Sequence, residues 1–416
     1  MNAVPRHDGA IDRDSADVGL DAARLERIDA HFTRYIDDGR LPGWQVLVAR
    51  DGDVVYNRCR GWRNREVGTE FTPDTIVRLY SMTKPLTSVL AMMLHEEGRI
   101  GLKDPVSNYI SEFADTAVYR SGSYLRPVTE PQVEPIRIWH LLTHMSGLTY
   151  GFHNTHPVDA MYRAAGFEWG SPAGADLAEC CARWAQLPLV FQPGSEWNYG
   201  VSTDVLGRVV EVVEGKPLDE VMRDRITTPL GMVDTAFSVT DDERRGRLAQ
   251  LYIPNPADLT AVAAPDVLSQ RTAPTMLSGG GGLFGTAQDY LQFCRMVAGG
   301  GCRGEVRLLG RHTVDYMGSN HLPGGADLEQ VGRPLFAETS FDGVGFGLGY
   351  SIVVDPVANR VPSSVGEMAW GGAASTAFWI DPVEDLIVIF LTQLLPSSTH
   401  PIRPELKQLV YQALVD

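Results

Sequence analysis

Strand-like segments lie at both ends of this chain, and helix-like segments occupy its middle. Near the N-terminus, two β-branched runs in WQVLVARDGDVVYNRCRG (44–61) flank Asp51-Gly52, a dipeptide typical of hairpin turns. Near the C-terminus, further strands are predicted in GFGLGYSIVV (345–354), ASTAFWIDP (374–382) and DLIVIFLTQL (385–394). Consecutive hairpins favour an antiparallel sheet, so the pattern predicts an α+β fold in which both chain ends build one sheet.

The helix-like segments suggest how the chain divides into domains. Residues 20–39 show apolar side chains near a helical period, and 403–415 is predicted to be a closing helix. We therefore expect a sheet domain made of 19–80 plus 335–416 and flanked by these terminal helices. An inserted, mainly helical domain at 81–334 and a flexible N-terminal arm at 1–18 complete the division. A cleft between the two domains is the natural place for an active site.

Charge and composition argue against several kinds of partner. The formal net charge is −16 at pH 7, and a field of that sign repels nucleic acid and anionic membranes. Hydrophobic residues make up 44% of the chain and charged residues 21%, as in ordinary globular proteins. The longest apolar runs, such as VLAMML and LIVIFL, fall far short of the roughly 20 residues that span a bilayer. We expect neither a nucleic-acid nor a membrane partner.

The cysteines and the N-terminus bear on the cellular compartment. The chain has five cysteines, an odd number without C-x-x-C spacing, which favours free thiols in a reducing environment. Its first residues, MNAVPRHDGAIDRDSADVG, carry charges throughout and lack the apolar core of a secretory signal. We therefore expect a cytoplasmic protein.

The stretch LYSMTKPLTSVLAMML (79–94) places Ser81 three residues before Lys84 at the head of an apolar helix. Positions i and i+3 share a helix face, so the two side chains can touch. A serine hydroxyl is a weak nucleophile until a base takes its proton, and burial favours the neutral amine that makes lysine a base. The alternative is an ordinary helix cap followed by a lysine whose amine reaches solvent, because S-x-x-K also occurs by chance.

Two other stretches provide further polar or exposed-backbone groups. Tyr199, in PGSEWNYGVSTDVLGRVVE, lies in a loop just before a predicted helix. In MAWGGAAST, Gly371 and Gly372 follow Trp370 where a strand is expected. A strand left bare by glycine can lie close to a substrate and offer it a backbone N–H. The competing interpretations are a buried tyrosine with a hydrogen-bond partner and a tryptophan that only packs in the core.

Together these stretches resemble the serine β-lactamase and penicillin-binding-protein superfamily, on its class C branch, and most of all the family VIII carboxylesterases. The resemblance runs from about residue 20 to the C-terminus. It rests on SMTK, on YGVS followed by TDVLG, and on WGG in the place of a K-T-G-like motif. The stretches LLTHMSGL, GGGGLFGTAQDY and GLGY resemble further signatures of the family, in the family's order.

The resemblance implies a β-lactamase/transpeptidase-like fold, a role for each matched residue, and no metal or other cofactor. Ser81 would be the acylated nucleophile, and Lys84 would accept its proton, alone or jointly with Tyr199. Tyr199 would pass a proton to the leaving alcohol and then activate water. The backbone N–H groups of Ser81 and Ala373 would form the oxyanion hole, which contributes several kcal/mol of transition-state stabilisation in such enzymes, roughly 3–4 kcal/mol.

Two departures from the β-lactamase pattern point to the substrate. Val201 replaces the asparagine of Y-x-N, so a side-chain amide that would hold a substrate amide is lost. WGG replaces K-T-G, so the cation that faces a substrate carboxylate becomes the indole of Trp370, which suits an uncharged group. We therefore predict a serine carboxylesterase that hydrolyses short-chain, uncharged esters, with possible acyl transfer to a second alcohol. Trp370, Gly371, Gly372 and Val201 are expected at the substrate.

Other interpretations remain open at this stage. The runner-up enzyme is a β-lactamase or D,D-peptidase-like hydrolase, and a different class is a non-catalytic penicillin-recognising binding protein. His140 and His144 have metal-ligand spacing, but no glutamate lies between them and the family uses no metal, so none is expected. Tyr150 and Phe152 are further candidate substrate contacts. The only partner expected is a small-molecule ester, and the oligomeric state is left open.

Overall fold

The computed structural model describes residues 4–265, 273–333 and 340–416. Its main feature is an antiparallel sheet in the order β1-β3-β2-β17-β16-β15-β14-β13, with β4 paired to β3. The strands of this sheet are β1 (Arg6–Asp8), β2 (Gly43–Arg50), β3 (Asp53–Asn64), β4 (Thr69–Glu70), β13 (Val344–Phe346), β14 (Ser351–Val353), β15 (Met368–Gly371), β16 (Ala377–Asp381) and β17 (Leu386–Leu391). Both chain ends contribute to it, which confirms the predicted α+β fold.

The two ends meet where β17 pairs with β2. Ile389 lies opposite Leu47, and Val388 opposite Val48. All six residues of β17 are buried, so the run LIVIFL is a central strand covered on both faces. The predicted hairpin at Asp51-Gly52 is also confirmed, because β2 and β3 pair on either side of it.

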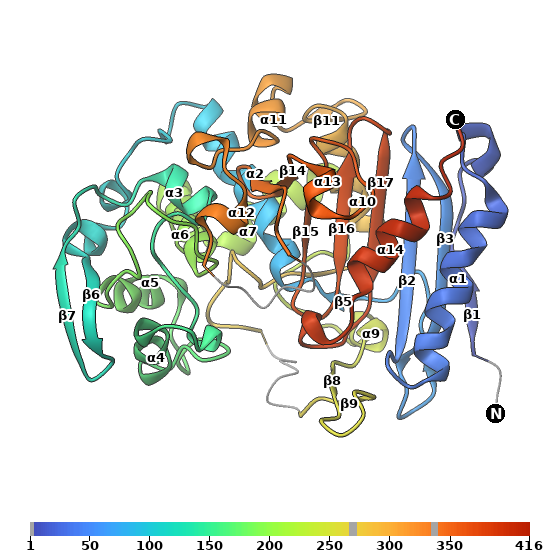
Figure 1. Cartoon of the computed structure of the whole chain (residues 1–416), viewed down its shortest axis with the longest axis horizontal. Coiled ribbons are helices and arrows are strands. Elements are labelled where there is room, and N and C mark those ends of the chain that lie inside the picture. Colours follow the sequence, from blue (N-terminus) through green and yellow to red (C-terminus); the bar gives the residue numbers. More distant parts are fainter. Residues whose placement is uncertain (1–3, 266–272, 334–339) are drawn as a thin grey trace.

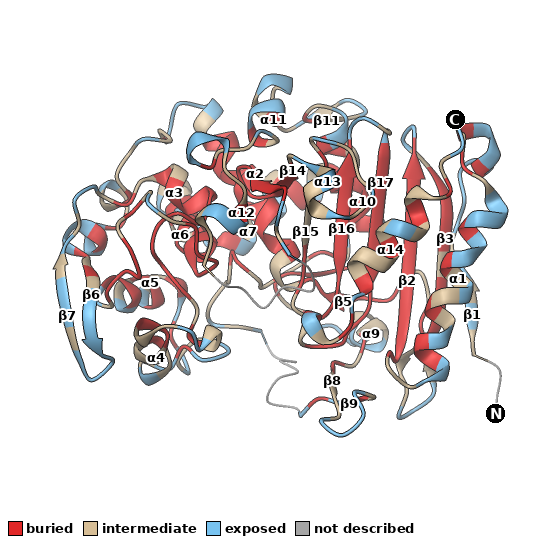
Figure 2. Cartoon of the chain, viewed as in Figure 1, coloured by how far each residue is buried: buried red, intermediate tan, exposed pale blue. Residues whose placement is uncertain are grey.

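Helices cover both faces of this sheet (Figures 1 and 2). The terminal helices α1 (Ala22–Asp37) and α14 (Ile402–Tyr411) pack on one face, where Val388 and Phe390 join their buried side chains. On the other face, Ile387 and Ile389 share a core with α2 (Thr83–Glu96) and α10 (Ala287–Ala298). Alternate residues of β17 thus pack into two different cores, because successive side chains of a β-strand point to opposite faces of the sheet.

The remaining helices lie mostly beyond the sheet, between α2 and β13 in the chain. They are α3 (Ile138–Leu142), α4 (Pro157–Ala164), α5 (Leu177–Ala185), α6 (Ser202–Glu214), α7 (Leu218–Met222), α8 (Thr228–Leu230), α9 (Asp242–Arg247), α11 (Arg311–Met317) and α12 (Leu328–Val331), while α13 (Pro356–Asn359) follows β14. Short two-stranded pairs accompany them: β5 (Val77–Arg78) with β10 (Phe284–Gly285), β6 (Ala117–Ser123) with β7 (Arg126–Pro131), β8 (Tyr252–Pro254) with β9 (Ala261–Ala263), and β11 (Cys302–Arg303) with β12 (Val306–Arg307).

The division into a sheet domain (19–80 plus 335–416) and an inserted helical domain (81–334) stays a prediction. Because α2 and α10 pack directly on the sheet, the buried core runs without a break from the sheet into the helical part. The predicted boundary at 334/335 lies outside the described residues.

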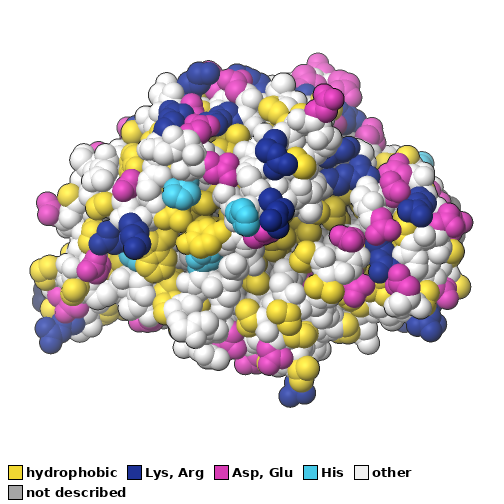
Figure 3. All heavy atoms as spheres, turned by 90° about the horizontal axis from the view of Figure 1, so that it is seen from above, with side chains coloured by type: hydrophobic (Ala, Val, Ile, Leu, Met, Phe, Trp, Pro, Cys, Tyr) yellow, Lys and Arg dark blue, Asp and Glu magenta, His cyan; other side chains and the backbone are white. Residues whose placement is uncertain are grey.

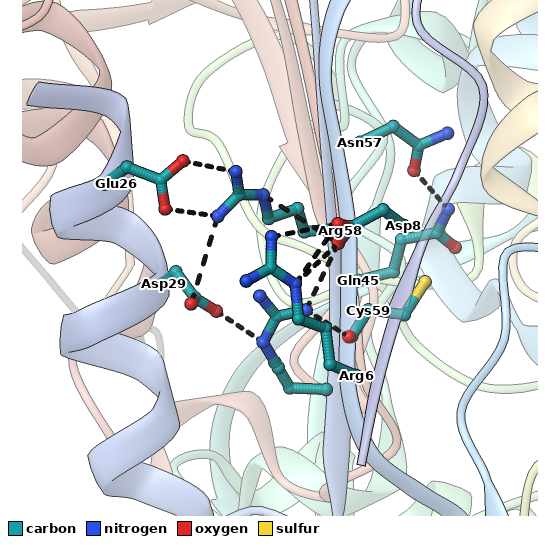
Figure 4. Close-up of polar contacts among 9 residues, drawn as sticks. Arg6, Asp8, Glu26, Asp29, Gln45, Asn57, Arg58 and Cys59 are labelled. Atoms are coloured by element: carbon teal, nitrogen blue, oxygen red, sulfur yellow. Dashed lines mark hydrogen bonds and ion pairs between the residues drawn. The ribbon is translucent and has the colours of Figure 1, made fainter. Parts of the chain in front are cut away.

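The N-terminal segment differs from the predicted flexible arm. From residue 4 onwards it lies against the sheet, where β1 pairs with β3 and places His7 opposite Cys59. Charged side chains reinforce this pairing: Arg58 of β3 lies between Asp8 of β1 and Glu26 of α1 (Figure 4). The N-terminal segment is polar and does not alternate apolar with polar residues. Because β1 pairs with β3 through backbone groups and charged side chains, its sequence carries no hydrophobic pattern that predicts a strand.

The described residues contain no helix with the length and apolar character to cross a bilayer. Acidic and basic side chains are interspersed over the face in Figure 3, with a group of hydrophobic side chains near its centre.

Candidate active site

Ser81 lies in a short 3-10 turn, Tyr80–Met82, that leads directly into α2. The backbone just before Ser81 fixes the position of this turn. Tyr80 has a left-handed φ of 45°, an uncommon conformation for a residue with a side chain. The N–H of Leu79 donates to the carbonyl of Leu283 at 2.9 Å, which ties the strand before Ser81 to its neighbour. Ser81 is half-buried and lines a cavity of about 780 Å³.

Lys84 lies on the first turn of α2 and is only 1% exposed. Its ammonium donates to three oxygens: Ser81 Oγ at 3.2 Å, Tyr150 Oη at 3.1 Å and the Gly280 carbonyl at 2.8 Å. These three bonds match the three donors of an ammonium group, so a buried cation is fully satisfied. The structure thus brings Ser81 and Lys84 together on one helix face, and Lys84 does not reach solvent.

Tyr199 is buried just before α6 and packs against aromatic rings. Its ring centroid lies 4.9 Å from that of His144 and 5.4 Å from that of Trp370. Lys84 Nζ lies 4.5 Å from the centre of the Tyr199 ring, and the Tyr199 hydroxyl accepts a hydrogen bond from Trp370 Nε1 at 3.3 Å. The structure therefore places the three predicted catalytic side chains in one cluster.

The end of β15 runs past the segment before Ser81. A Cβ on Gly372 would overlap the carbonyl of Leu79, and a Cβ on Gly371 would overlap the carbonyl of Thr376, so both positions require glycine. Ala373 follows Gly372 directly, and the role of its backbone N–H in an oxyanion hole stays a prediction. Trp370, Gly371, Gly372 and Ala373 all line the same cavity as Ser81.

Tyr150 was expected as a substrate contact, but it also contacts the catalytic cluster itself. Besides accepting from Lys84, its ring lies edge-on to that of Tyr199, with centroids 5.5 Å apart. Burial raises the pKa of its hydroxyl well above the ordinary value, and the negative charge of Asp204 acts in the same direction. The hydroxyl therefore stays protonated at neutral pH and can donate as well as accept.

Asp204 was not singled out from the sequence beyond its place in TDVLG. It lies on α6, 2% exposed, and accepts hydrogen bonds from Ser278 Oγ at 2.5 Å and from the Gly280 N–H at 3.0 Å. Burial raises the pKa of this carboxyl, and the positive charge of Lys84 opposes that rise. The carboxylate holds the glycine-rich segment whose Gly280 carbonyl accepts from Lys84.

The other candidates take different positions. Phe152 and Val201 line the cavity, as expected of substrate contacts. His140 lies elsewhere: its Nδ1 accepts from the Arg137 N–H at 3.0 Å, and burial lowers its pKa to about 3. Across the ranges that the structure describes, no three His, Cys, Asp or Glu side chains gather as metal ligands would.

The chain matches known proteins over nearly its full length. Residues 28–412 match the sequence profile of the family described as Beta-lactamase. Esterase EstB of Burkholderia gladioli is 32% identical, with 97% of this chain and 99% of that protein covered. Lovastatin esterase of Penicillium rubens is 31% identical, with 92% and 96% covered. Among solved structures, EstCE1, a hydrolase with promiscuous acyltransferase activity, is 29% identical with a TM-score of 0.77, and the match covers 94% of this chain and 99% of that one.

Proposed function

The chain belongs to the beta-lactamase family, and we propose that it is a serine carboxylesterase of the family VIII kind, working through an acyl-enzyme on Ser81. The contact that supports this most directly is the 3.2 Å separation between Ser81 Oγ and Lys84 Nζ in a cavity open to a ligand. A nucleophile within hydrogen-bond reach of a buried base is the arrangement that nucleophilic catalysis needs. The esterases among its relatives point to the same reaction class.

In the acylation step, the neutral amine of Lys84 accepts the proton of Ser81 as Oγ attacks the ester carbonyl carbon. Negative charge then develops on the carbonyl oxygen, and the N–H groups of Ser81 and Ala373 stabilise it. When the tetrahedral intermediate collapses, the bond to the alcohol breaks and the alcohol oxygen takes a proton from the cluster. Lys84 passes that proton through a tyrosine hydroxyl, with Tyr199 as the predicted donor.

Tyr150 adds to this proton path, because its hydroxyl is the one that Lys84 contacts at 3.1 Å. Deacylation repeats the chemistry with water as the nucleophile: the cluster takes a proton from water, and Ser81 leaves as the restored alcohol. A second alcohol in place of water gives acyl transfer. Because the side chains of this cluster interact closely, we assign the transferred proton to the cluster as a whole and not to one residue.

The specificity proposal rests on Trp370 and Val201. The indole of Trp370 stands on β15 beside Tyr199, where the resemblance places a cation in β-lactamases. Val201 is buried at the start of α6 and offers no amide. Both changes favour an uncharged ester over a β-lactam or a peptide terminus.

We propose the cytoplasm as the location, because all five cysteines are unpaired thiols and four of them are buried. Cell fractionation tests this.

The function is tested with p-nitrophenyl esters of acyl chains from about two to twelve carbons, with nitrocefin in parallel. We expect turnover of short esters, slow or no turnover of nitrocefin, and loss of activity in Ser81→Ala. A fluorophosphonate probe should label the wild-type enzyme and not Ser81→Ala. Rapid nitrocefin hydrolysis would contradict the substrate class, and an unlabelled wild-type enzyme would favour the binding-protein alternative.

A further inference from the structure

Three aromatic rings form a continuous stack along one wall of the cavity. The rings of Tyr150 and Phe152 lie 4.7 Å apart at an interplanar angle of 17°, and those of Phe152 and Trp169 lie 4.7 Å apart at 10°. We call these three residues the aromatic stack. All three line the cavity that holds Ser81.

The aromatic stack runs from the reacting centre to the surface. Its inner end is Tyr150, whose hydroxyl accepts from Lys84. Its outer end is Trp169, which is 55% exposed in the segment between α4 and α5. A tryptophan exposed at the mouth of a cavity leaves a large apolar face to water, and such faces usually mark where a ligand binds.

The charges around the cavity indicate that the ligand group is neutral. Among the described residues, the cations that line the cavity are engaged within the protein: Arg78 donates to the Ala249 carbonyl, Arg403 to the Gly372 carbonyl, and Lys407 pairs with Glu367. An anionic group placed along the aromatic stack would therefore gain little from them. A flat, uncharged ring would gain from offset stacking.

The direction of the aromatic stack tells which half of the ester lies along it. The carbonyl oxygen of the ester turns toward the N–H groups of Ser81 and Ala373, on the side of β15. The leaving oxygen must face the cluster that protonates it, in which Tyr199 is the predicted donor and Tyr150 lies edge-on to Tyr199. The body of the alcohol therefore continues past Tyr150 toward Trp169.

Building on the esterase function above, we propose that the aromatic stack is a binding subsite for a planar aromatic ring on the alcohol part of the ester. The substrates that this subsite selects are esters of a short acid with a benzyl-type alcohol, in which one CH₂ group joins the aromatic ring to the ester oxygen. The subsite holds the ring by stacking and adds no charge contact.

The test compares two esters whose rings differ in planarity. Benzyl acetate and cyclohexylmethyl acetate share the acid and have leaving alcohols of similar size. We expect kcat/KM to favour the benzyl ester by about two- to tenfold, the factor that one aromatic pair contributes. A second pair, methyl phenylacetate and methyl cyclohexylacetate, moves the ring to the acid side and should show no such preference.

Two variants connect that preference to the aromatic stack. In Trp169→Leu, the ratio of benzyl to cyclohexylmethyl turnover should fall toward one, and Phe152→Leu should lower it as well. Tyr124→Leu removes an exposed aromatic ring on the β6–β7 hairpin, outside the cavity lining, and should leave the ratio unchanged.

Equal rates for the two acetates, or a ratio that survives in Trp169→Leu, would overturn the subsite. A preference confined to the methyl esters would overturn its assignment to the alcohol side. Failure of the esterase function itself looks different: neither acetate turns over, and the fluorophosphonate probe does not label Ser81.

Discussion

Replacing Asp204 by Asn should lower the esterase activity. The buried carboxylate accepts from Ser278 and from the N–H of Gly280, while the carbonyl of Gly280 accepts from Lys84. Asn keeps the shape of the side chain and one accepting oxygen but removes the negative charge. The substitution therefore separates the charge of Asp204 from its role in holding the glycine-rich segment.

The size of the effect follows from the path between the two charges. The carboxylate and the ammonium are joined through Gly280 alone, by hydrogen bonds of 3.0 Å and 2.8 Å. Adding the span of one residue puts the charges no more than ~9 Å apart. At an effective dielectric constant of about 20, the attraction is then about 2 kcal/mol.

The sign follows from what Lys84 must do. When Lys84 accepts the proton of Ser81, it gains a positive charge that the Asp204 carboxylate attracts. Without the carboxylate the proton transfer loses this attraction of about 2 kcal/mol, so kcat/KM should fall about ten- to thirtyfold. The measurement is kcat/KM on a short p-nitrophenyl ester at neutral pH.

Asp289→Asn serves as the matched control. Asp289 is also a buried helix aspartate, but it accepts from Thr235 and the Asp234 N–H, away from Lys84. We expect its kcat/KM to stay close to that of the wild-type enzyme. The reasoning is refuted if kcat/KM of Asp204→Asn is unchanged, rises, or falls no further than that of the control.

Three more predictions address the proton path, pH-dependent stability and the core. Tyr150→Phe removes an acceptor of the Lys84 ammonium, so kcat should fall about ten- to hundredfold; an unchanged kcat would remove Tyr150 from the proton path. Burial raises the pKa of Asp289 from 3.8 to about 6, so its stabilising contribution is present below about pH 4 and lost as pH rises through about 6. Between pH 4 and pH 7, the free energy of unfolding of Asp289→Asn, measured with urea, should therefore rise by about 3 kcal/mol relative to that of the wild type. A difference between the two proteins that does not change with pH would contradict the raised pKa of Asp289. Phe390→Ala empties a fully buried position 5.3 Å from the ring of Phe32 and should lower the free energy of unfolding by about 3–5 kcal/mol; a loss under 1 kcal/mol would mean the core refills.

Local patterns in the sequence determined several features of this protein. The hairpin at Asp51-Gly52 and the central strand 386–391 follow from turn chemistry and β-branched composition within a few residues. The contact between Ser81 and Lys84 follows from helix geometry, because i and i+3 share a face wherever the helix lies. The resemblance to the family gave Tyr199 and Trp370 their expected roles, and the structure brings both to the same cluster.

Only the tertiary structure decided the rest. Tyr150 reaches Lys84 from 66 residues away, and the Gly280 carbonyl reaches it from 196 residues away. Neither spacing has a period or motif that predicts contact, because such pairs depend on how whole elements pack. The same holds for Asp204, Trp169 and the N-terminal strand. Sequence periodicity records which face of an element is buried, whereas the partner it meets is set by the packing of the complete chain.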